Sequence, residues 1–209
     1  MKKLRIALTK GRLEQKTVEL LERAGLNCAP LRDKGRKLIA EIAGAEFVFA
    51  KAADVVTYVE YGVADLGVVG KDTLMEADRR VCEVLDLGFG ACRFALAALK
   101  GSEFYKGYET KTVATKYPRV AKRFFERKNL DVDIIRIEGS VELAPLLKLA
   151  DGIVDIVETG TTLRENGLEV IETVADISAR LIANPASYKL KRAEIEAFSG
   201  LLSKSLTEV

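Results

Sequence analysis

The sequence of 209 residues contains no histidine. This absence excludes the Ser-His-Asp and Cys-His arrangements of nucleophilic catalysis, and it excludes any zinc site that needs a histidine ligand. Any reaction at this protein must therefore use carboxylates, lysine, arginine, hydroxyls, backbone donors or a metal ion held by oxygen ligands.

Cysteine is also scarce. Cys28, Cys82 and Cys92 are the only three, and no C-x-x-C pair occurs. An odd number without paired spacing is typical of reduced cysteines that pack as small apolar side chains, rather than of a disulfide framework. We therefore expect three buried thiols.

Long apolar runs and a strong net charge are both missing. No segment approaches the roughly 20 apolar residues of a membrane span, and the apolar stretch near the N-terminus is too short for a signal peptide. The 33 basic and 31 acidic side chains give a net charge of +2, which provides no general field for nucleic acid or an acidic membrane. We expect a cytoplasmic protein that binds neither.

Short apolar strands alternate with amphipathic helices along the chain, which is typical of an α/β protein. The 48% of hydrophobic residues suffices for one large domain or two small lobes with a core. We expect strands at 4–8, 38–42, 46–50, 64–70, 81–87, 92–99, 111–115, 132–137, 153–157, 168–174 and 177–182. We expect helices at 13–24, 54–61, 73–79, 118–128, 141–149 and 189–206, and one that starts at 163.

Two segments resemble each other at an offset of 90 residues. G-V-A-D-L at 62–66 precedes Gly70, and G-I-V-D-I at 152–156 precedes Gly160. Either chance or two lobes built on one plan explains this, and two lobes are the simpler interpretation. We expect residues 1–90 with 180–209 to form the first lobe and residues 91–179 the second, with a ligand cleft between their strand ends.

The stretch 152–168 is the strongest candidate for a binding loop. Its apolar start predicts a buried strand, and the turn E-T-G-T-T at 158–162 leads into a helix. Backbone N–H groups at such a turn, with threonine hydroxyls, can bind phosphate, whereas Asp155 and Glu158 suit ribose hydroxyls or a Mg²⁺ shell. The stretch fits a sugar phosphate, and an ordinary capped turn is the alternative.

Basic residues gather after and near the first expected strand. Lys10 and Arg12 flank Gly11 at the strand end, which is where open α/β sheets bind ligands. A second group lies in the loop before the strand at 38–42 and consists of Arg32, Lys34, Arg36 and Lys37. Each group is either an anion site or a solvated face.

With these motifs in place, the sequence resembles the short form of ATP phosphoribosyltransferase over nearly its whole length. Six segments carry the resemblance: TKGRLEQ at 9–15, DVVTYVEYGVADLGVVGKD at 54–72, ATKYPRVAKRF at 114–124, EGSVELAPL at 138–146, VDIVETGTTLRENGL at 154–168 and NPASYK at 184–189. The resemblance implies a two-lobed α/β fold like that of type II periplasmic binding proteins. It also implies the first step of histidine biosynthesis, in which N1 of ATP is joined to C1 of phosphoribosyl pyrophosphate and Mg²⁺ is required.

The resemblance assigns residues to both substrates. Its phosphoribosyl pyrophosphate loop matches Asp155, Glu158, Thr159, Gly160, Thr161, Thr162 and Leu163. Its ATP side matches Lys10, Gly11, Arg12, Arg36 and Asp72. We take Arg12 and Arg36 as catalytic candidates, because forked donors can neutralise departing pyrophosphate. We expect no Mg²⁺ ligand from protein side chains, since substrate oxygens can hold the ion.

Two other functions compete with this interpretation. A solute-binding protein of the same fold would need no pyrophosphate clamp, and the T-G-T-T loop argues against it. A type I phosphoribosyltransferase acting on a free base is the second. Enzymes of that type place two adjacent acids before the loop, whereas Val154 precedes Asp155 here.

The last expected helix, 189–206, carries the apolar residues Ile195, Phe198, Leu201 and Leu202. This stripe can pack on the first lobe, contribute to an assembly, or do both. The resemblance implies that the chain relies on a separate regulatory subunit similar to a histidyl-tRNA synthetase catalytic core. We therefore expect a homodimer that joins such a subunit in a hetero-oligomer.

Overall fold

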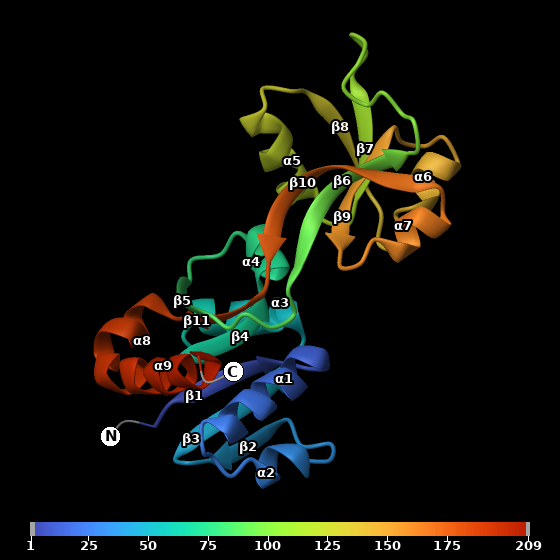
Figure 1. Ribbon diagram of the computed structural model, residues 1–209. Coiled ribbons are helices and arrows are strands. Elements are labelled where there is room, and N and C mark those ends of the chain that lie inside the picture. The colour runs from blue at the N-terminus through green and yellow to red at the C-terminus, as the bar shows by residue number, and fades with distance from the viewer. Residues whose placement is uncertain (1–2, 208–209) are drawn as a thin grey trace. The chain divides into compact units, whose positions relative to one another are not determined.

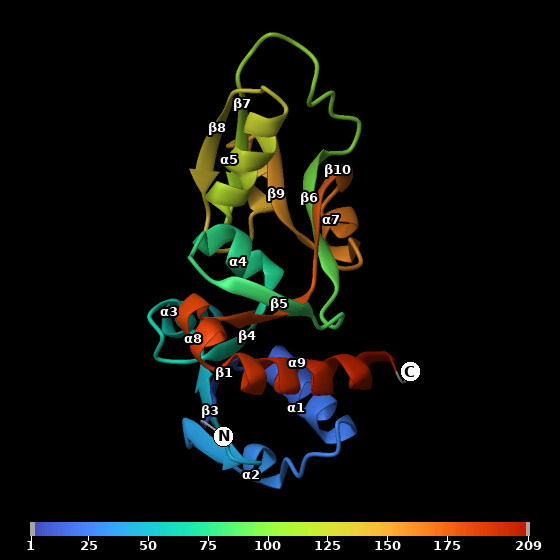
Figure 2. The same ribbon diagram turned by 90° about the vertical axis from the view of Figure 1, so that its left-hand side faces the viewer.

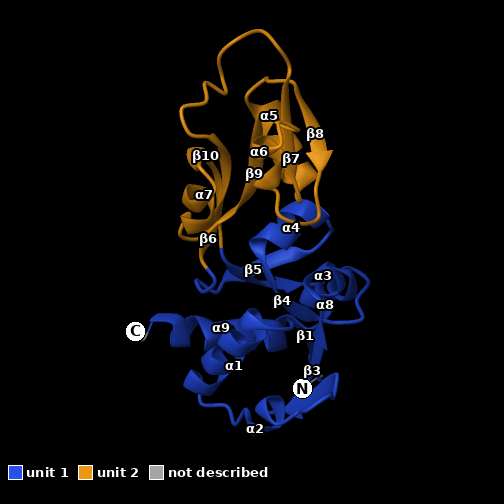
Figure 3. Cartoon of the chain, turned by 90° about the vertical axis from the view of Figure 1, so that its right-hand side faces the viewer, with its two compact units in different colours: residues 1–90, 178–209 blue, residues 91–177 orange. Residues whose placement is uncertain are grey.

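A β-sheet with helices on both faces forms the centre of each of two units in the computed structural model, which describes residues 3–207 (Figure 1). Unit 1 comprises Met1–Gly90 and Ser178–Val209, and unit 2 comprises Ala91–Ile177 (Figure 3). The expected boundary after residue 179 falls inside a strand of unit 1, so the observed division lies two residues earlier. No helix within residues 3–207 is long and apolar enough to cross a membrane.

Unit 1 contains a six-stranded sheet in the order β2-β3-β1-β4-β11-β5. The strands are β1 (Arg5–Thr9), β2 (Ile39–Ile42), β3 (Ala45–Ala50), β4 (Leu66–Gly70), β5 (Cys82–Asp86) and β11 (Ala179–Ala183). Because β1 pairs in parallel with both β3 and β4, the carboxyl ends of these three strands meet at one edge, which we call the carboxyl edge of unit 1.

The helices of unit 1 cover both faces of its sheet. They are α1 (Arg12–Arg23), α2 (Ala29–Arg32), α3 (Ala52–Glu60), α4 (Lys71–Ala77), α8 (Pro185–Leu190) and α9 (Arg192–Thr207). Alternate residues of β1 face opposite sides, so Leu8 packs in the cluster that contains Leu20 of α1 and Ile195 of α9, whereas Ala7 packs with Val55 of α3. Helices α1 and α9 lie side by side (Figures 1 and 2).

Unit 2 contains a five-stranded sheet in the order β10-β6-β9-β7-β8. The strands are β6 (Cys92–Leu99), β7 (Lys111–Thr115), β8 (Val132–Arg136), β9 (Gly152–Val157) and β10 (Leu168–Ile177), and the helices are α5 (Pro118–Arg127), α6 (Leu143–Leu146) and α7 (Thr161–Glu165). The carboxyl ends of the parallel strands β7, β8 and β9 define the carboxyl edge of unit 2. The antiparallel strand β6 starts at the same edge.

Several predicted element boundaries were wrong, each for a local reason. The helix expected at 141–149 is only α6, because Lys148 adopts a left-handed φ of 59°. The helix expected at 189–206 starts earlier and is divided into α8 and α9, because Asn184 caps Pro185–Leu190 through the N–H groups of Ala186 and Ser187. The strand expected at 168–174 continues to Ile177 through two irregularities in its pairing.

The expectation of three buried cysteines was only partly correct. All three are reduced, but only Cys28 is buried, while Cys82 and Cys92 are partly exposed. Both of these begin strands, where side chains have fewer neighbours than in the middle of a sheet.

The two units do repeat a local motif, but the predicted offset of 90 residues was wrong. Asp65 accepts the N–H of Arg5 at 2.9 Å, and its own N–H donates to the carbonyl of Arg5 at 2.8 Å. Asp151 makes the same two bonds with Thr112, at 2.7 and 2.8 Å. Asp65 therefore corresponds to Asp151 and not to Asp155, which lies near the other end of β9.

Candidate functional site

The turn Lys10–Gly11–Arg12 leaves β1 at the carboxyl edge of unit 1. The hydroxyl of Thr9 donates to the carbonyl of Val68 at 2.8 Å, and the N–H of Lys10 donates to the carbonyl of Ala50 at 2.9 Å. These bonds fix the turn to both neighbouring strands. Gly11 adopts a φ of 94°, which side-chain-bearing residues rarely adopt, and Arg12 then begins α1. The side chains of Lys10 and Arg12 are exposed.

The second basic group divides into paired and unpaired residues. Arg32 donates to both carboxylate oxygens of Glu22 at 2.6 Å, and Lys34 pairs with Glu14 and lies 4.5 Å from the centre of the Phe49 ring. Arg36 and Lys37, by contrast, are exposed and form no side-chain hydrogen bond or ion pair within residues 3–207. Arg36 and Lys37 are therefore available for an external anion.

The loop that carries Arg36 lies at the same edge as the Lys10 turn. β2 runs antiparallel to β3, so the loop before β2 meets the carboxyl end of β3. The N–H of Phe49 donates to the carbonyl of Leu38 at 2.9 Å and ties the loop there. The structure thus brings Lys10, Arg12 and Arg36 to one edge of unit 1.

Asp72 follows β4 at this edge, in the first turn of α4. A Cβ atom added to Gly70 would lie only 2.1 Å from a carboxylate oxygen of Asp72, so glycine leaves the space that this carboxylate occupies. The neighbouring Lys71 pairs with Glu83 of β5. Asp72 thus lies directly beside the end of β4.

The loop from Glu158 to Thr162 leaves β9 at the carboxyl edge of unit 2. Gly160 adopts a φ of 73° and caps α7. Arg164 of α7 stabilises the loop, because its guanidinium donates to the carbonyl of Thr159 at 3.1 Å and to the hydroxyl of Thr161 at 3.0 Å. Leu163 is buried in the core of unit 2, so only its backbone can contact a ligand.

Asp155 lies in β9, shortly before this loop, in a partly buried position. Burial raises the pKa of Asp155, and the N–H of Ile156 opposes the shift. The charges of Glu142 and Lys116 also act on this pKa, the first raising it and the second lowering it. A perturbed carboxyl near a loop of donors is typical of a functional site.

Lys116 and Glu142, whose charges act on Asp155, were not predicted from the sequence as site residues. Both belong to segments that carry the family resemblance, ATKYPRVAKRF and EGSVELAPL. Lys116 follows β7 and Glu142 precedes α6. They approach Asp155 only because β7 pairs with β9 and because α6 packs on the face of the sheet that carries Ile153 and Val157.

No group of three histidine, cysteine, aspartate or glutamate side chains within residues 3–207 could hold a metal ion.

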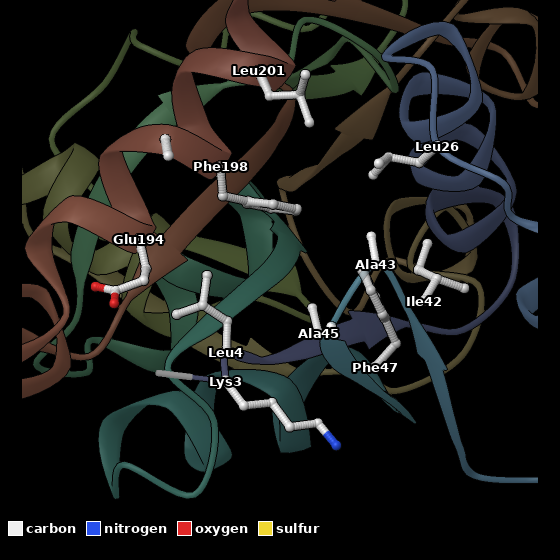
Figure 4. Close-up of a pocket in the computed structure, with 12 residues that line it drawn as sticks. Lys3, Leu4, Leu26, Ile42, Ala43, Ala45, Phe47, Glu194, Phe198 and Leu201 are labelled. Atoms are coloured by element: carbon white, nitrogen blue, oxygen red, sulfur yellow. The ribbon is translucent and has the colours of Figure 1, made fainter. Parts of the chain in front are cut away.

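A cavity of about 470 Å³ lies at the opposite edge of the unit 1 sheet (Figure 4). Phe198 and Leu201 of α9 point toward Leu26 and toward residues of β2 and β3, and Leu4, just before β1, also lines the cavity. The cavity is mostly apolar, and none of the predicted site residues lines it. It is therefore separate from the candidate site.

Comparisons with known proteins place the chain in a family. Residues 51–204 match a family model described as HisG, ATP phosphoribosyltransferase. ATP phosphoribosyltransferase from Clostridium kluyveri is 55% identical over 210 residues, which cover 100% of this chain and 96% of the relative. The enzyme of the same name from Clostridium botulinum (strain 657) is 56% identical over 199 residues, covering 93% of this chain and 94% of the relative.

Solved structures are similar as well. A chain of the ATP phosphoribosyl transferase (HisG:HisZ) complex from Thermotoga maritima aligns with a TM-score of 0.82 at 35% identity, covering 99% of this chain and 100% of that chain. The periplasmic aliphatic sulphonate binding protein SsuA from Escherichia coli aligns with a TM-score of 0.60 at 11% identity, covering 99% and 73%. The second likeness concerns the fold alone, and it confirms the predicted resemblance to periplasmic binding proteins.

Proposed function

The chain belongs to the ATP phosphoribosyltransferase family, which catalyses the first step of histidine biosynthesis, and we propose that each of the two carboxyl edges binds one of its two substrates. The carboxyl edge of unit 1 binds ATP through Lys10, Gly11, Arg12, Arg36 and Asp72. The carboxyl edge of unit 2 binds phosphoribosyl pyrophosphate through Asp155, Glu158 and residues 159–163. The observation that carries this proposal is the turn at Gly160, which follows directly on the strand that contains the partly buried Asp155.

The loop suits the 5′-phosphate end of the sugar. Backbone N–H groups of Thr159 to Thr162 and the threonine hydroxyls supply donors without a net negative charge. Glu158 and Asp155 accept hydrogen bonds from the ribose hydroxyls. Donation from a hydroxyl would stabilise the ionised form of Asp155, which burial disfavours in the free chain.

The transfer forms a bond from adenine N1 to ribose C1 while the bond from C1 to the pyrophosphate oxygen breaks. The electron pair of that bond leaves with pyrophosphate, and the lone pair of N1 makes the new bond. The residues at the site must hold the two substrates in line and neutralise the leaving group. A general base is not needed to expose the N1 lone pair, which is consistent with a chain that lacks histidine.

Arg12 and Arg36 neutralise the pyrophosphate charge that develops as the bond breaks. Arginine suits this role because its planar fork can donate two hydrogen bonds to one phosphoryl group. Mg²⁺, when bound, supplies further positive charge to the pyrophosphate oxygens. Arg36 is free to turn toward a phosphate because no residue within 3–207 pairs with its side chain.

The activity assay measures pyrophosphate release with ATP and phosphoribosyl pyrophosphate as substrates. Free adenine and orotate replace ATP in parallel reactions. Release with ATP alone among these acceptors supports the assigned reaction, and release with adenine or orotate would favour a type I enzyme. Binding of phosphoribosyl pyrophosphate without any release would favour a solute-binding protein.

The proposal extends to partners and location. The similar chain from Thermotoga maritima belongs to a complex described as HisG:HisZ. We expect this chain to form a homodimer that joins a histidyl-tRNA-synthetase-like regulatory subunit, and to act in the cytoplasm. Light scattering of the purified chain, alone and mixed with such a subunit, measures both assemblies.

A further inference from the structure

Arg93 occupies the second position of β6, at the carboxyl edge of unit 2. It lies opposite Val157, the last residue of β9, and Ala95 lies opposite Asp155. Residues opposite each other in antiparallel strands share one face of a sheet, as do residues two apart in one strand. Arg93 therefore shares its face with Asp155 and Val157. Leu163 of α7 packs on this same face, in one cluster with Ala95 and Val157.

The guanidinium of Arg93 has no partner in the described chain. Its Nε–H group is buried and donates to no acceptor, and the side chain forms no hydrogen bond or ion pair within residues 3–207. Asp176 of β10 lies opposite Arg93 on the other side, yet no ion pair joins the two. Buried polar groups in folded proteins are nearly always paired, so an unpaired arginine at this place needs an explanation.

An arginine in a strand does not lack a partner merely because of its position, as Arg180 of β11 shows. The Nε atom of Arg180 is also buried without a partner, but its Nη2 donates to Asp86 at 2.9 Å. Its charge is therefore balanced within unit 1. Arg93 has no such carboxylate, although Asp155, Glu158 and Asp176 all lie at the same edge. Because Arg93 pairs with none of these carboxylates, its guanidinium is available to bind an anion from solution.

We propose that Arg93 binds a phosphoryl group of phosphoribosyl pyrophosphate, beside the loop from Glu158 to Thr162. This inference rests on the proposed function of that loop. The loop supplies backbone and hydroxyl donors, which carry no full positive charge. Arg93 adds a positive charge and a forked set of donors on the side of β9 that faces β6. The guanidinium of Arg93, which is unpaired in the free chain, then gains an acceptor when the substrate binds.

The test compares Arg93→Met with wild type and with a matched control, Arg127→Met. Methionine keeps an unbranched apolar chain and removes the guanidinium. Arg127 is exposed at the end of α5, and its Nε donates only to the carbonyl of Arg123. Calorimetric titrations use phosphoribosyl pyrophosphate, ribose 5-phosphate, pyrophosphate and ATP as separate ligands, and thermal unfolding of the free chains measures stability.

We expect Arg93→Met to bind phosphoribosyl pyrophosphate about tenfold more weakly or worse, because a charge-assisted pair is lost. ATP affinity should not change, and Arg127→Met should behave as wild type. The melting temperature of free Arg93→Met should be equal to or above that of wild type, because the substitution removes an unsatisfied buried donor. A purely structural arginine would give the opposite change in melting temperature.

The smaller ligands locate the contact. Weaker binding of ribose 5-phosphate assigns Arg93 to the 5′-phosphate, and weaker binding of pyrophosphate assigns it to the leaving group. Unchanged affinity of Arg93→Met for phosphoribosyl pyrophosphate overturns the inference and leaves the proposed function intact. A lower melting temperature with loss of ATP binding also overturns it. Wild-type chain that binds no phosphoribosyl pyrophosphate would instead refute the proposed function of the loop, and this inference with it.

Discussion

Asp151, which directly precedes β9, and Asp155, which lies near the carboxyl end of β9, have different surroundings. Asp151 is exposed and accepts the backbone N–H of Thr112 at 2.7 Å. Asp155 is partly buried at the carboxyl edge, and burial raises its pKa. The first carboxylate therefore supports the pairing of β7 with β9, and the second belongs to the candidate site.

Replacement of Asp151 should reduce stability and leave binding intact. Asp151→Ala removes one hydrogen bond to the backbone, which costs about 1 kcal/mol in the free energy of unfolding. Urea denaturation measures this change, and the KM for phosphoribosyl pyrophosphate should stay at the wild-type value. Asp151→Asn keeps an acceptor and serves as the control. A large rise in KM with unchanged stability would show that Asp151 belongs to the site.

The corresponding change in unit 1 should cost more. Asp65 is buried and accepts from Arg5, from the hydroxyl of Ser187 at 2.7 Å and from Lys191 at 2.7 Å. Asp65→Ala leaves the partly buried ammonium of Lys191 without its carboxylate. The midpoint of urea denaturation should therefore fall further than for Asp151→Ala, and equal midpoints would contradict this account.

Asp155 should make the stability of the free chain depend on pH. Its pKa is raised by burial, so the folded chain binds this proton more tightly than the unfolded chain. The ionised carboxylate therefore lowers stability above its ordinary pKa, and the cost grows until the pH passes the raised value. Asp155→Asn should unfold at a higher temperature than wild type near neutral pH.

The two chains should converge below about pH 3.5, where Asp155 is protonated in both states. Thermal unfolding at a series of pH values measures the difference. A constant difference between Asp155→Asn and wild type across this range would exclude the titration of Asp155 as its cause.

Gly160 offers a test of loop geometry with a matched control. Gly160 and Gly167 flank α7 with φ values of 73° and 70°. Alanine at either position should therefore lower the free energy of unfolding by a similar amount, about 1 kcal/mol. A Cβ atom at Gly160 would lie 3.4 Å from Nη1 of Arg164, whereas one at Gly167 meets nothing within 4 Å. Only Gly160→Ala should raise the KM for phosphoribosyl pyrophosphate.

Neither alanine variant should change the KM for ATP, because both glycines lie in unit 2. Thr162→Ala should also weaken binding of phosphoribosyl pyrophosphate, since it removes a hydroxyl donor from the loop between Glu158 and Thr162. Equal effects of Gly160→Ala and Gly167→Ala on this KM would indicate that lost stability, and not the loop, is responsible.

Arg36 and Arg32 form a second matched pair, in one basic segment. Arg36 has no partner within residues 3–207, whereas Arg32 pairs with Glu22. Arg36→Ala should lower kcat at least tenfold, as expected for loss of a charge-assisted contact of about 1.5–3 kcal/mol, and leave the melting temperature unchanged. Arg32→Ala should retain wild-type kcat.

Arg36→Lys should recover only part of the rate, because an ammonium cannot reproduce a forked contact. Arg12→Ala should lower kcat in the same way. Steady-state kinetics at saturating ATP and phosphoribosyl pyrophosphate provide the measurement. Wild-type kcat in either alanine variant would remove that arginine from the proposed mechanism.

Free histidine should not inhibit the purified chain. Inhibition should appear only after addition of the regulatory subunit, because feedback then depends on coupling between sites on two chains. A histidine titration of pyrophosphate release, with and without the subunit, measures this. Strong inhibition of the chain alone at low micromolar histidine would place the sensor within these 209 residues.

Local features of the fold and site could be predicted from the sequence. Short apolar runs specified the strands, because alternation and β-branching favour a pleated, buried backbone. Glycine marked the turns at Gly11 and Gly160, where φ is positive and a Cβ atom would be strained. Six ordered motifs identified the family, as the full-length relatives confirm. Each of these depends on residues that are close together in the chain.

Contacts between distant segments were decided only by the tertiary structure. The sequence does not distinguish Arg32 and Lys34 from Arg36. In the structure, Glu22 and Glu14 of α1 pair with Arg32 and Lys34. By sequence motif, Asp155 corresponds to Asp65. Strand pairing shows instead that Asp151 is the equivalent residue. The residues next to Arg93 in the sequence do not indicate its role, because its lack of a partner depends on the register of β6 between β9 and β10. A residue's own conformation is encoded locally, whereas its partner depends on which strands pair and in which register.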